Sequence, residues 1–240
     1  MKTKHYYHFE NGFEILNDSN WDMLRTDERE TPFSIEKTQE KYEENCNKEI
    51  IYKRHAEILN DIIETNLITD KRLFSMGCGK AVLEYHLKKI KPDSYLICSD
   101  YTKYAIERLK RVFLECNELL TFDMLNKDDY LKIMPEDIVI MYRVSTEFSV
   151  ENWKLVFDNL FNRNIKNIVF IPTGILTLKE LVQEKINYLC RAVKLKKNTF
   201  CGWLYDEKAF SSFWENKYII RESRYVENNC FYYLERIDYS

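Results

Sequence analysis

Apolar and polar positions follow two different periods along this chain, and the change between them outlines its elements. From Ser34 to about Asn66 the apolar residues recur near helical spacing, which predicts a helical segment. Short apolar runs then alternate with helical patterns from residue 72 to residue 172. We expect strands over 72–76, 94–99, 119–123, 137–143 and 165–172, and helices over 80–90, 103–117 and 150–163.

This strand–helix alternation predicts a parallel sheet with helices on both faces. The runs "IVIMY" and "NIVFI" are apolar throughout, as expected of central strands that are covered on both sides. The end of the chain departs from this strand–helix alternation. A helix is expected over 178–197, another over 205–216, and two strands over 217–226 and 229–237 joined by the turn-like "ENN". These two strands predict an antiparallel hairpin at the sheet edge.

Length and composition restrict the protein class. The 240 residues suit one domain of ordinary size with a sizeable core. The net charge of −3 disfavours a large nucleic-acid-binding surface. The sequence contains no run of about 18 apolar residues, the length that a membrane-spanning helix needs. The segment "MKTKHYYHFENGFEI" lacks the apolar core of a secretory signal. The seven cysteines are scattered and none forms a C-x-x-C pair, which favours reduced thiols and a cytoplasmic location.

Two of the five glycines lie one residue apart, in "RLFSMGCGKAVLEYHL". Gly77 and Gly79 follow the first strand and precede a helix, where a doubly wound sheet binds a nucleotide-like ligand. A tight turn and a close ligand would both exclude a Cβ atom. The helix N-terminus would then direct free N–H groups at the ligand. A plain glycine turn is the alternative.

Asp100 ends the next strand, 21 positions after Gly79. An acid at this distance can accept hydrogen bonds from both ribose hydroxyls. Asp100 or Thr102 could also cap the helix that follows, and both roles are compatible. A dinucleotide fingerprint needs a third glycine, where this chain has Val82, which argues against NAD.

The pattern G-C-G-x-A, with Ala81 in third place, resembles motif I of the class I S-adenosylmethionine-dependent methyltransferases. The resemblance extends from about Leu73 to the C-terminus. It implies an α/β, doubly wound, seven-stranded and mostly parallel Rossmann-like sheet with an antiparallel C-terminal hairpin, and S-adenosylmethionine as the cofactor. It divides the chain into an N-terminal helical lid over 1–66 and a methyltransferase domain over 67–240, with an insertion over 174–203 suited to substrate recognition.

The resemblance also implies a set of cofactor-binding residues: Ser75, Gly77, Cys78, Gly79, Glu84, Asp100, Tyr101, Asp123, Met124 and Tyr142. Ser75 stands where family members often carry an acid. Glu84 matches a residue near the methionine end of the cofactor, or is an exposed partner of Lys88 four positions on. Tyr101 would cover the adenine. Asp123 would accept from the adenine amino group, or cap a turn, and Met124 would offer an N–H and an apolar wall.

The catalytic residues are not evident from the sequence. Tyr142 and Arg143 leave the fourth strand where the reacting methyl group should lie, so both are candidates for lining that site; Arg143 could pair with an anionic substrate group or lie on the surface. The tetrapeptides N-P-P-Y and D-P-P-Y are absent, which disfavours methylation of DNA bases or glutamine. The histidines suggest packing or surface roles. His86 is not a favoured base, and His5 or His8 could act only from a folded-over N-terminal segment.

We therefore expect methyl transfer to oxygen of a small-molecule or sugar-containing acceptor, by a cytoplasmic monomer or homodimer with no nucleic-acid partner, no membrane partner and no metal. Two alternatives stay open: an NAD(P)-binding Rossmann oxidoreductase, and a non-catalytic S-adenosylmethionine-binding module. Residues 1–34 carry six aromatic side chains, and we expect them to fold over the cleft as a lid.

Overall fold

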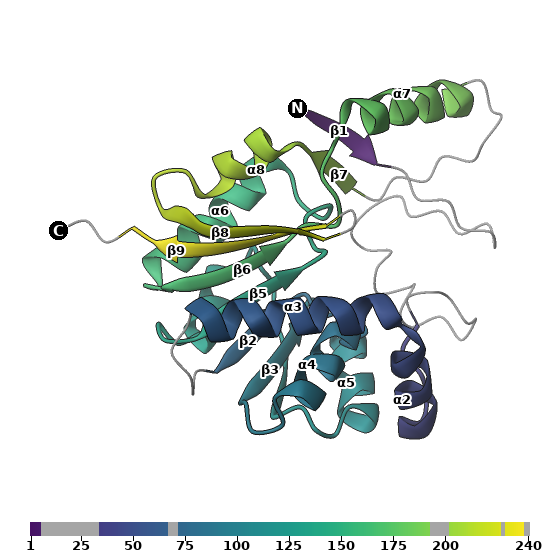
Figure 1. The fold of residues 1–240 in the computed structure, drawn as a ribbon, viewed down its shortest axis with the longest axis vertical. Helices are drawn as coiled ribbons and strands as arrows, with labels where there is room; N and C mark the ends of the chain where they lie inside the picture. The colour runs from purple at the N-terminus through teal and green to yellow at the C-terminus, as the bar shows by residue number, and fades with distance from the viewer. Residues whose placement is uncertain (6–33, 67–71, 193–201, 227–228, 238–240) are drawn as a thin grey trace.

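The computed structural model describes residues 1–5, 34–66, 72–192, 202–226 and 229–237 (Figure 1). Its centre is a seven-stranded sheet with the strand order β4-β3-β2-β5-β6-β9-β8. The strands are β2 (Leu73–Met76), β3 (Leu96–Asp100), β4 (Glu118–Thr121), β5 (Ile138–Tyr142), β6 (Asn167–Ile171), β8 (Tyr218–Val226) and β9 (Asn229–Arg236). Only β9 runs against its neighbours, pairing antiparallel with both β6 and β8. The predicted fold class is therefore confirmed, including the C-terminal hairpin.

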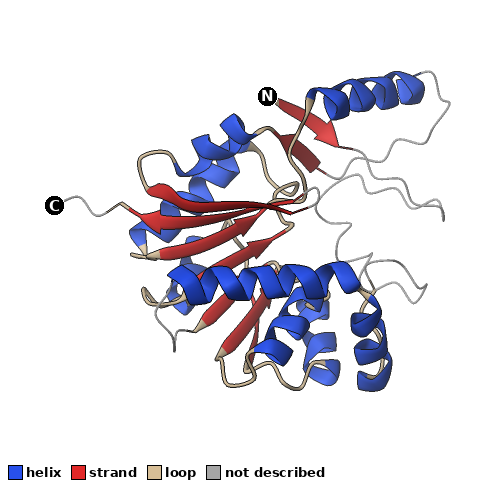
Figure 2. Ribbon diagram, in the orientation of Figure 1, coloured by secondary structure: helices blue, strands red, loops and turns tan. Residues whose placement is uncertain are grey.

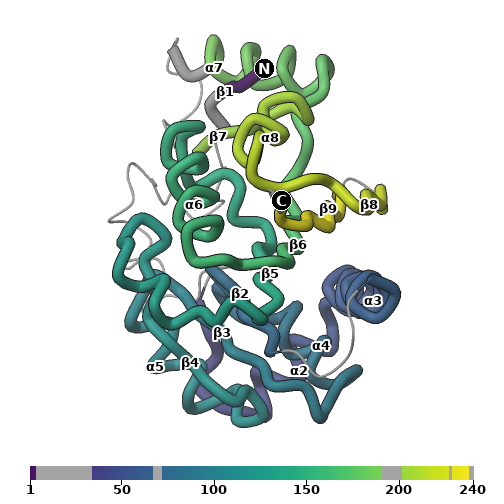
Figure 3. Tube along the Cα trace, turned by 90° about the vertical axis from the view of Figure 1, so that its left-hand side faces the viewer, coloured from purple at the N-terminus to yellow at the C-terminus, as the bar shows by residue number. Residues whose placement is uncertain are grey.

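Helices cover both faces of this sheet (Figures 1 and 2). One face carries α2 (Gln39–Lys48), α3 (Ile50–Asn66), α4 (Val82–Ile90) and α5 (Lys103–Val112). The other carries the 3-10 helix η1 (Lys127–Lys132), α6 (Val150–Asn162) and α8 (Glu207–Trp214). Figure 3 shows α3 and α6 on opposite sides of β2 and β5. None of the helices in the described ranges is long and apolar enough to cross a membrane.

Successive side chains along each strand point to opposite faces of the sheet and so pack in two separate apolar cores. In β5, Ile138 and Ile140 enter the core under α3 and α4, while Val139 and Met141 enter the core under α6 and α8. The second core is rich in aromatic rings around Trp153, which stacks on Phe213 with 5.8 Å between ring centres and meets Phe148 and Phe170 edge-on. Burial on both faces explains why these strands read as continuous apolar runs.

The N-terminal helical pattern forms two helices rather than one. The break falls at Glu49, whose φ of −85° and ψ of 68° end α2, and α3 begins at the next residue. Both helices contribute to the core shared with α4 and α5, through residues such as Tyr42 and Leu59. Residues 34–66 therefore pack directly on the main sheet.

A second, two-stranded sheet lies beside the helix α7 (Leu178–Ala192), at the upper right of Figure 1. Its strands β1 (Lys2–His5) and β7 (Gly202–Tyr205) pair antiparallel. The sequence pattern did not predict this pairing. The remainder of the expected lid, residues 6–33, and the last part of the helix expected over 178–197 lie outside the described residues.

Candidate functional site

A cleft of about 560 Å³ lies at the carboxyl ends of the central strands, the place where open α/β sheets bind ligands. Its volume is within the range of roughly 300–1,000 Å³ usual for small-molecule sites. Every residue that the sequence predicted for the site lines this cleft except Ser75: Gly77, Cys78, Gly79, Glu84, Asp100, Tyr101, Asp123, Met124, Tyr142 and Arg143. Segments distant in sequence thus meet at one edge of the sheet.

The glycine loop adopts a backbone that favours glycine. Gly77 has a φ of 75° and Gly79 a φ of 59°, in the left-handed region where a Cβ atom is unfavourable. At Gly77 the protein itself leaves no room, because a Cβ atom would lie 2.6 Å from Cγ1 of Val144. Ala81, in the third motif position, also adopts a left-handed φ of 55° just before α4. The loop therefore has a strained, defined shape.

The N–H groups of this loop are already bonded. Those of Gly77 and Cys78 both donate to the carbonyl of Ser99, at 2.8 and 2.9 Å. The N–H of Gly79 donates to Oδ2 of Asp100 at 2.9 Å. The free donors expected at the helix N-terminus are therefore not those of these three loop residues. Their hydrogen bonds fix the loop against the end of β3.

Asp100 connects three elements at the end of β3. Its Oδ1 atom accepts from the backbone N–H of Thr102 at 2.9 Å and from the Thr102 hydroxyl at 2.8 Å, while Oδ2 holds the glycine loop. The carboxylate therefore orders the start of α5, as the capping alternative suggested, and also borders the cleft. Asp100 is 5% exposed, so its position is set before any ligand binds.

Glu84 lies in the first turn of α4 with only 1% of its surface exposed. Its carboxylate accepts a hydrogen bond from the Ser75 hydroxyl on β2. Burial raises the pKa of Glu84 from 4.5 to about 7; the Ser75 hydrogen bond opposes this rise and the nearby charge of Asp100 adds to it. The reading of Glu84 as an exposed partner of Lys88 is wrong, because Lys88 bonds the Ser94 carbonyl instead. Ser75 on β2 therefore supplies a hydroxyl at the position where the motif often has an acid, and the carboxylate beside β2 is that of Glu84 on α4.

The segment after β4 forms another wall. Asp123 accepts from the N–H of Leu125 at 2.8 Å, so the turn-capping role is present, and the residue also borders the cleft. Met124 is buried beside Gly77, and its carbonyl accepts from the Tyr130 hydroxyl. Tyr101, 58% exposed, stands at the rim. Its position allows the ring to close over a bound planar group.

Aromatic and basic side chains gather at the end of β5. The Tyr142 hydroxyl lies 2.8 Å from Nδ1 of His55, and the Tyr142 ring meets that of Tyr52 edge-on at 5.6 Å. Arg143 has a left-handed φ of 57°, and its Nη1 donates to the Tyr52 hydroxyl at 3.2 Å. Burial, followed by the neighbouring Tyr52, raises the pKa of Tyr142. Tyr142 is therefore a neutral hydroxyl at physiological pH.

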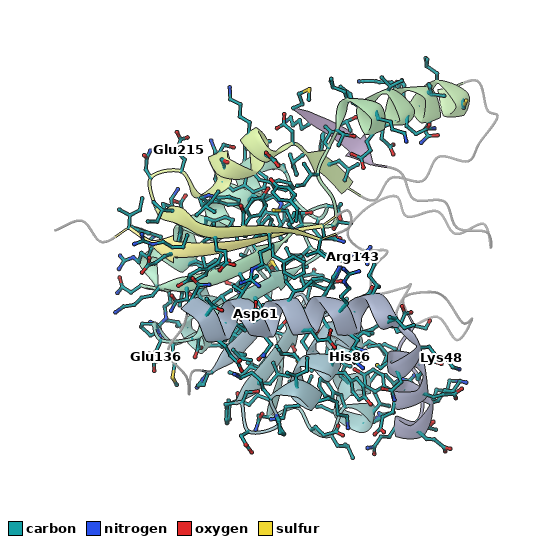
Figure 4. All side chains as sticks on the ribbon, viewed as in Figure 1. Lys48, Asp61, His86, Glu136, Arg143 and Glu215 are labelled. Carbon is teal, nitrogen blue, oxygen red and sulfur yellow. The ribbon has the colours of Figure 1, made fainter. Side chains whose placement is uncertain are left out.

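Tyr52 and His55 were not predicted as site residues. They lie three positions apart on α3, on one face of the helix. The periodic apolar pattern of 50–66 marks this face as packed but does not show what it packs against. His86, by contrast, is buried and bonds the carbonyl of Cys46 at 2.9 Å. Figure 4 shows it apart from Arg143, so it has a packing role.

No cluster of three or more His, Cys, Asp or Glu residues suited to a metal ion occurs within the described ranges. The cysteines in those ranges are free thiols: Cys46, Cys78, Cys98, Cys116, Cys190 and Cys230. The chemistry available among the residues that line the cleft is therefore that of carboxylates and hydroxyls, with the Cys78 thiol, the Lys80 amine and the Arg143 guanidinium.

Comparison with known proteins identifies the fold. The chain matches no family model, and it matches no curated protein. It is similar in structure to the magnesium protoporphyrin IX methyltransferase of Synechocystis PCC 6803 with bound SAH, with a TM-score of 0.59, 13% identity, and coverage of 91% of this chain and 94% of that one. It is similar to the mitomycin 7-O-methyltransferase, with a TM-score of 0.52, 12% identity, and coverage of 70% and 49%. A protein from Rhodobacter sphaeroides assigned to the Zn-dependent alcohol dehydrogenases has a TM-score of 0.57, 10% identity, and coverage of 75% and 89%. The chain thus has the fold of class I S-adenosylmethionine-dependent methyltransferases, as the motif resemblance implied.

Proposed function

We propose that this protein is an S-adenosylmethionine-dependent methyltransferase. The observation that carries the proposal is the convergence, in one cleft, of the left-handed glycine loop with Asp100, Asp123 and the buried carboxylate of Glu84. These groups come from four separate segments and correspond to the parts of one ligand. Two structural neighbours bear the names of methyltransferases, in agreement with this reading.

Each wall of the cleft has a role in this proposal. Asp100 accepts from the ribose hydroxyls, and Asp123 with Met124 borders the adenine, which Tyr101 covers from the rim. Glu84, with Ser75 behind it, faces the cationic methionine end. When bound, S-adenosylmethionine supplies an already activated methyl group, so the protein needs mainly to orient the acceptor and exclude water.

The proposed acceptor is a small or sugar-containing molecule methylated on oxygen. A structural neighbour named as an O-methyltransferase supports this choice. Tyr142 and Arg143 line the end of the cleft beside β5, where a hydroxyl-bearing acceptor with an anionic group would find a hydrogen-bonding phenol and a guanidinium. Glu49 and Tyr52 also line the cleft. These two residues support assigning substrate recognition to the N-terminal extension over 1–66; we assign the insertion over 174–203 to the same role on the motif resemblance.

The free thiols within the described ranges support a reducing, cytoplasmic location. We propose a monomer or homodimer, which size-exclusion chromatography with light scattering would determine.

Calorimetric titration with S-adenosylmethionine, and separately with NADH, tests the proposal. We expect S-adenosylmethionine to bind. Asp100→Asn should weaken that binding about ten- to a hundred-fold, or about 1–3 kcal/mol. Asp93→Asn, in an exposed turn, is the matched control and should leave it unchanged. Binding of NADH alone would establish the oxidoreductase alternative. S-adenosylmethionine binding with no turnover of any acceptor would favour a binding module.

A further inference from the structure

The contact between His55 and Tyr142 joins an N-terminal helix to the reacting end of the cleft. His55 lies on α3 with 1% of its surface exposed, and its Nδ1 atom is 2.8 Å from the Tyr142 hydroxyl. The rings of Tyr142 and Phe231 pack edge-on against the imidazole, at 5.8 and 5.3 Å between ring centres. Two elements thus hold the imidazole in place. Tyr142 lines the cleft, whereas His55 lies behind it.

The surroundings of this pair favour a neutral tyrosine whose hydroxyl lies within hydrogen-bonding distance of the His55 imidazole. The ionisable groups acting on Tyr142 are Tyr52 from α3, Arg143 directly after β5 and Glu84 from α4. Burial has the largest effect and raises the pKa of Tyr142, so the phenol does not act as a standing base. A neutral phenol can accept a proton from the acceptor only if it donates its own proton to another group at the same time. Nδ1 of His55 is within hydrogen-bonding distance of the Tyr142 hydroxyl and can be that group.

We propose that Tyr142 and His55 form a proton relay for the acceptor hydroxyl, with Tyr142 contacting the acceptor and His55 acting behind it as the positioning residue that receives the proton. This inference rests on the proposed methyl transfer to oxygen. It adds a route for the proton that oxygen methylation must release, and it assigns a role to His55, which was not predicted as a site residue.

The acceptor oxygen forms a bond to the methyl carbon, and the methyl–sulfur bond breaks with its electron pair retained by sulfur. The acceptor proton passes to the Tyr142 oxygen while the Tyr142 proton passes to Nδ1 of His55. The pair ends as a neutral phenol and an imidazolium; after the products leave, the imidazolium returns its proton to the Tyr142 oxygen while the Tyr142 hydroxyl proton passes to water in the cleft.

The relay requires a particular tautomer, which can be observed without an acceptor. His55 must be neutral with its proton on Nε2, so that Nδ1 accepts from Tyr142. In protein labelled with ¹⁵N-histidine, with and without S-adenosylmethionine, we expect the His55 Nδ1 resonance in the unprotonated range and a clear shift in Tyr142→Phe. His55→Gln identifies the resonance by its loss. A proton on Nδ1, or no response to Tyr142→Phe, would overturn the relay.

Kinetics give a second, independent reading with any hydroxyl acceptor that releases S-adenosylhomocysteine. We expect His55→Gln to lower kcat at least a hundred-fold, while the Kd for S-adenosylmethionine stays within about three-fold and the low-pH limb of the kcat/KM profile disappears. Tyr142→Phe should cause a similar loss, and the double variant no further loss. His86→Gln, at a buried histidine outside the cleft, is the matched control and should behave as wild type.

The outcomes separate the relay from the function on which it rests. If wild type does not bind S-adenosylmethionine, the proposed function fails. If it binds the cofactor and methylates an acceptor but His55→Gln keeps wild-type kcat and pH profile, the relay alone is refuted. An equal loss at every pH, accompanied by weaker cofactor binding, would show that His55 only supports the fold.

Discussion

Replacing Glu84 with Gln tests the most unusual electrostatic feature of the cleft. The side chain is almost fully buried, and its pKa rises from 4.5 to about 7 because burial disfavours the charged form. Gln keeps the shape and can still accept from the Ser75 hydroxyl. The variant therefore removes the ionisation and little else.

The sign of the effect follows from proton linkage. The folded state binds more protons than the unfolded state between the two pKa values, so this group lowers the free energy of unfolding as pH rises from about 4.5 to about 7. The full loss is about 3 kcal/mol at roughly 1.4 kcal/mol per pKa unit, and most of it develops between pH 5 and pH 8.5. Glu84→Gln should therefore gain stability over wild type by about this amount across that range.

Urea unfolding of both proteins without ligand, at several pH values, measures this difference directly. Glu107→Gln, at an exposed position on α5, is the control and should give curves parallel to wild type. A bound cationic ligand should instead stabilise the charged form of Glu84. S-adenosylmethionine should lower the pKa of Glu84, so that binding near pH 6 releases a proton, which calorimetry in two buffers of different ionisation enthalpy would detect. Stability curves of wild type and Glu84→Gln that stay parallel, or equal proton release by both, would refute this reasoning.

Two further substitutions examine the packing that shapes the cleft. Gly77→Ala should lower the free energy of unfolding by about 2 kcal/mol or more, because the new Cβ atom would meet Val144 and the φ of this residue is left-handed. Adding Val144→Ala should recover the part of this loss that comes from packing. Gly174→Ala, with open space around it, is the control and should change the free energy of unfolding by less than about 0.5 kcal/mol. Trp153→Ala should lower the free energy of unfolding by about 3–5 kcal/mol, since its ring is fully buried and its Nε1 donates to the Ser145 carbonyl behind the cleft. Urea denaturation measures this loss, with Leu155→Ala at a half-exposed position as the control. A loss well below this range would contradict the reasoning.

The sheet could be predicted from the sequence because its signals are local. Apolar runs such as "IVIMY", bounded by polar turns, indicate strands that are covered on both sides, and the pattern G-C-G-x-A lies between such a run and a helix. The residues at the strand ends then meet by topology alone, so Asp100 and Asp123 could be expected at the same edge. The structure brings them to one cleft.

The features that were missed depend on contacts between distant segments. Glu84 and Lys88 have the spacing of an exposed helical pair, yet six consecutive residues of α4, from Val82 to Leu87, are buried. This helix packs on the sheet at β3 and is flanked by α3 and α2, so it has no solvated face over that stretch. His55 could not be related to Tyr142 for the same reason, because 87 positions separate them. The pairing of β1 with β7 likewise joins segments that lie far apart in the sequence, residues 2–5 and 202–205, and no local pattern predicts it.

The place of β9 inside the sheet has a consequence for biosynthesis. This strand is made after all the others, yet it pairs with both β6 and β8 and contributes Phe231 and Tyr232 to the two cores. At about 5–20 residues per second, a nascent chain on the ribosome would expose the edge of β6 until the final strand emerges. A premature stop codon shortly before residue 229 would therefore remove few residues but leave an open, apolar edge prone to aggregation.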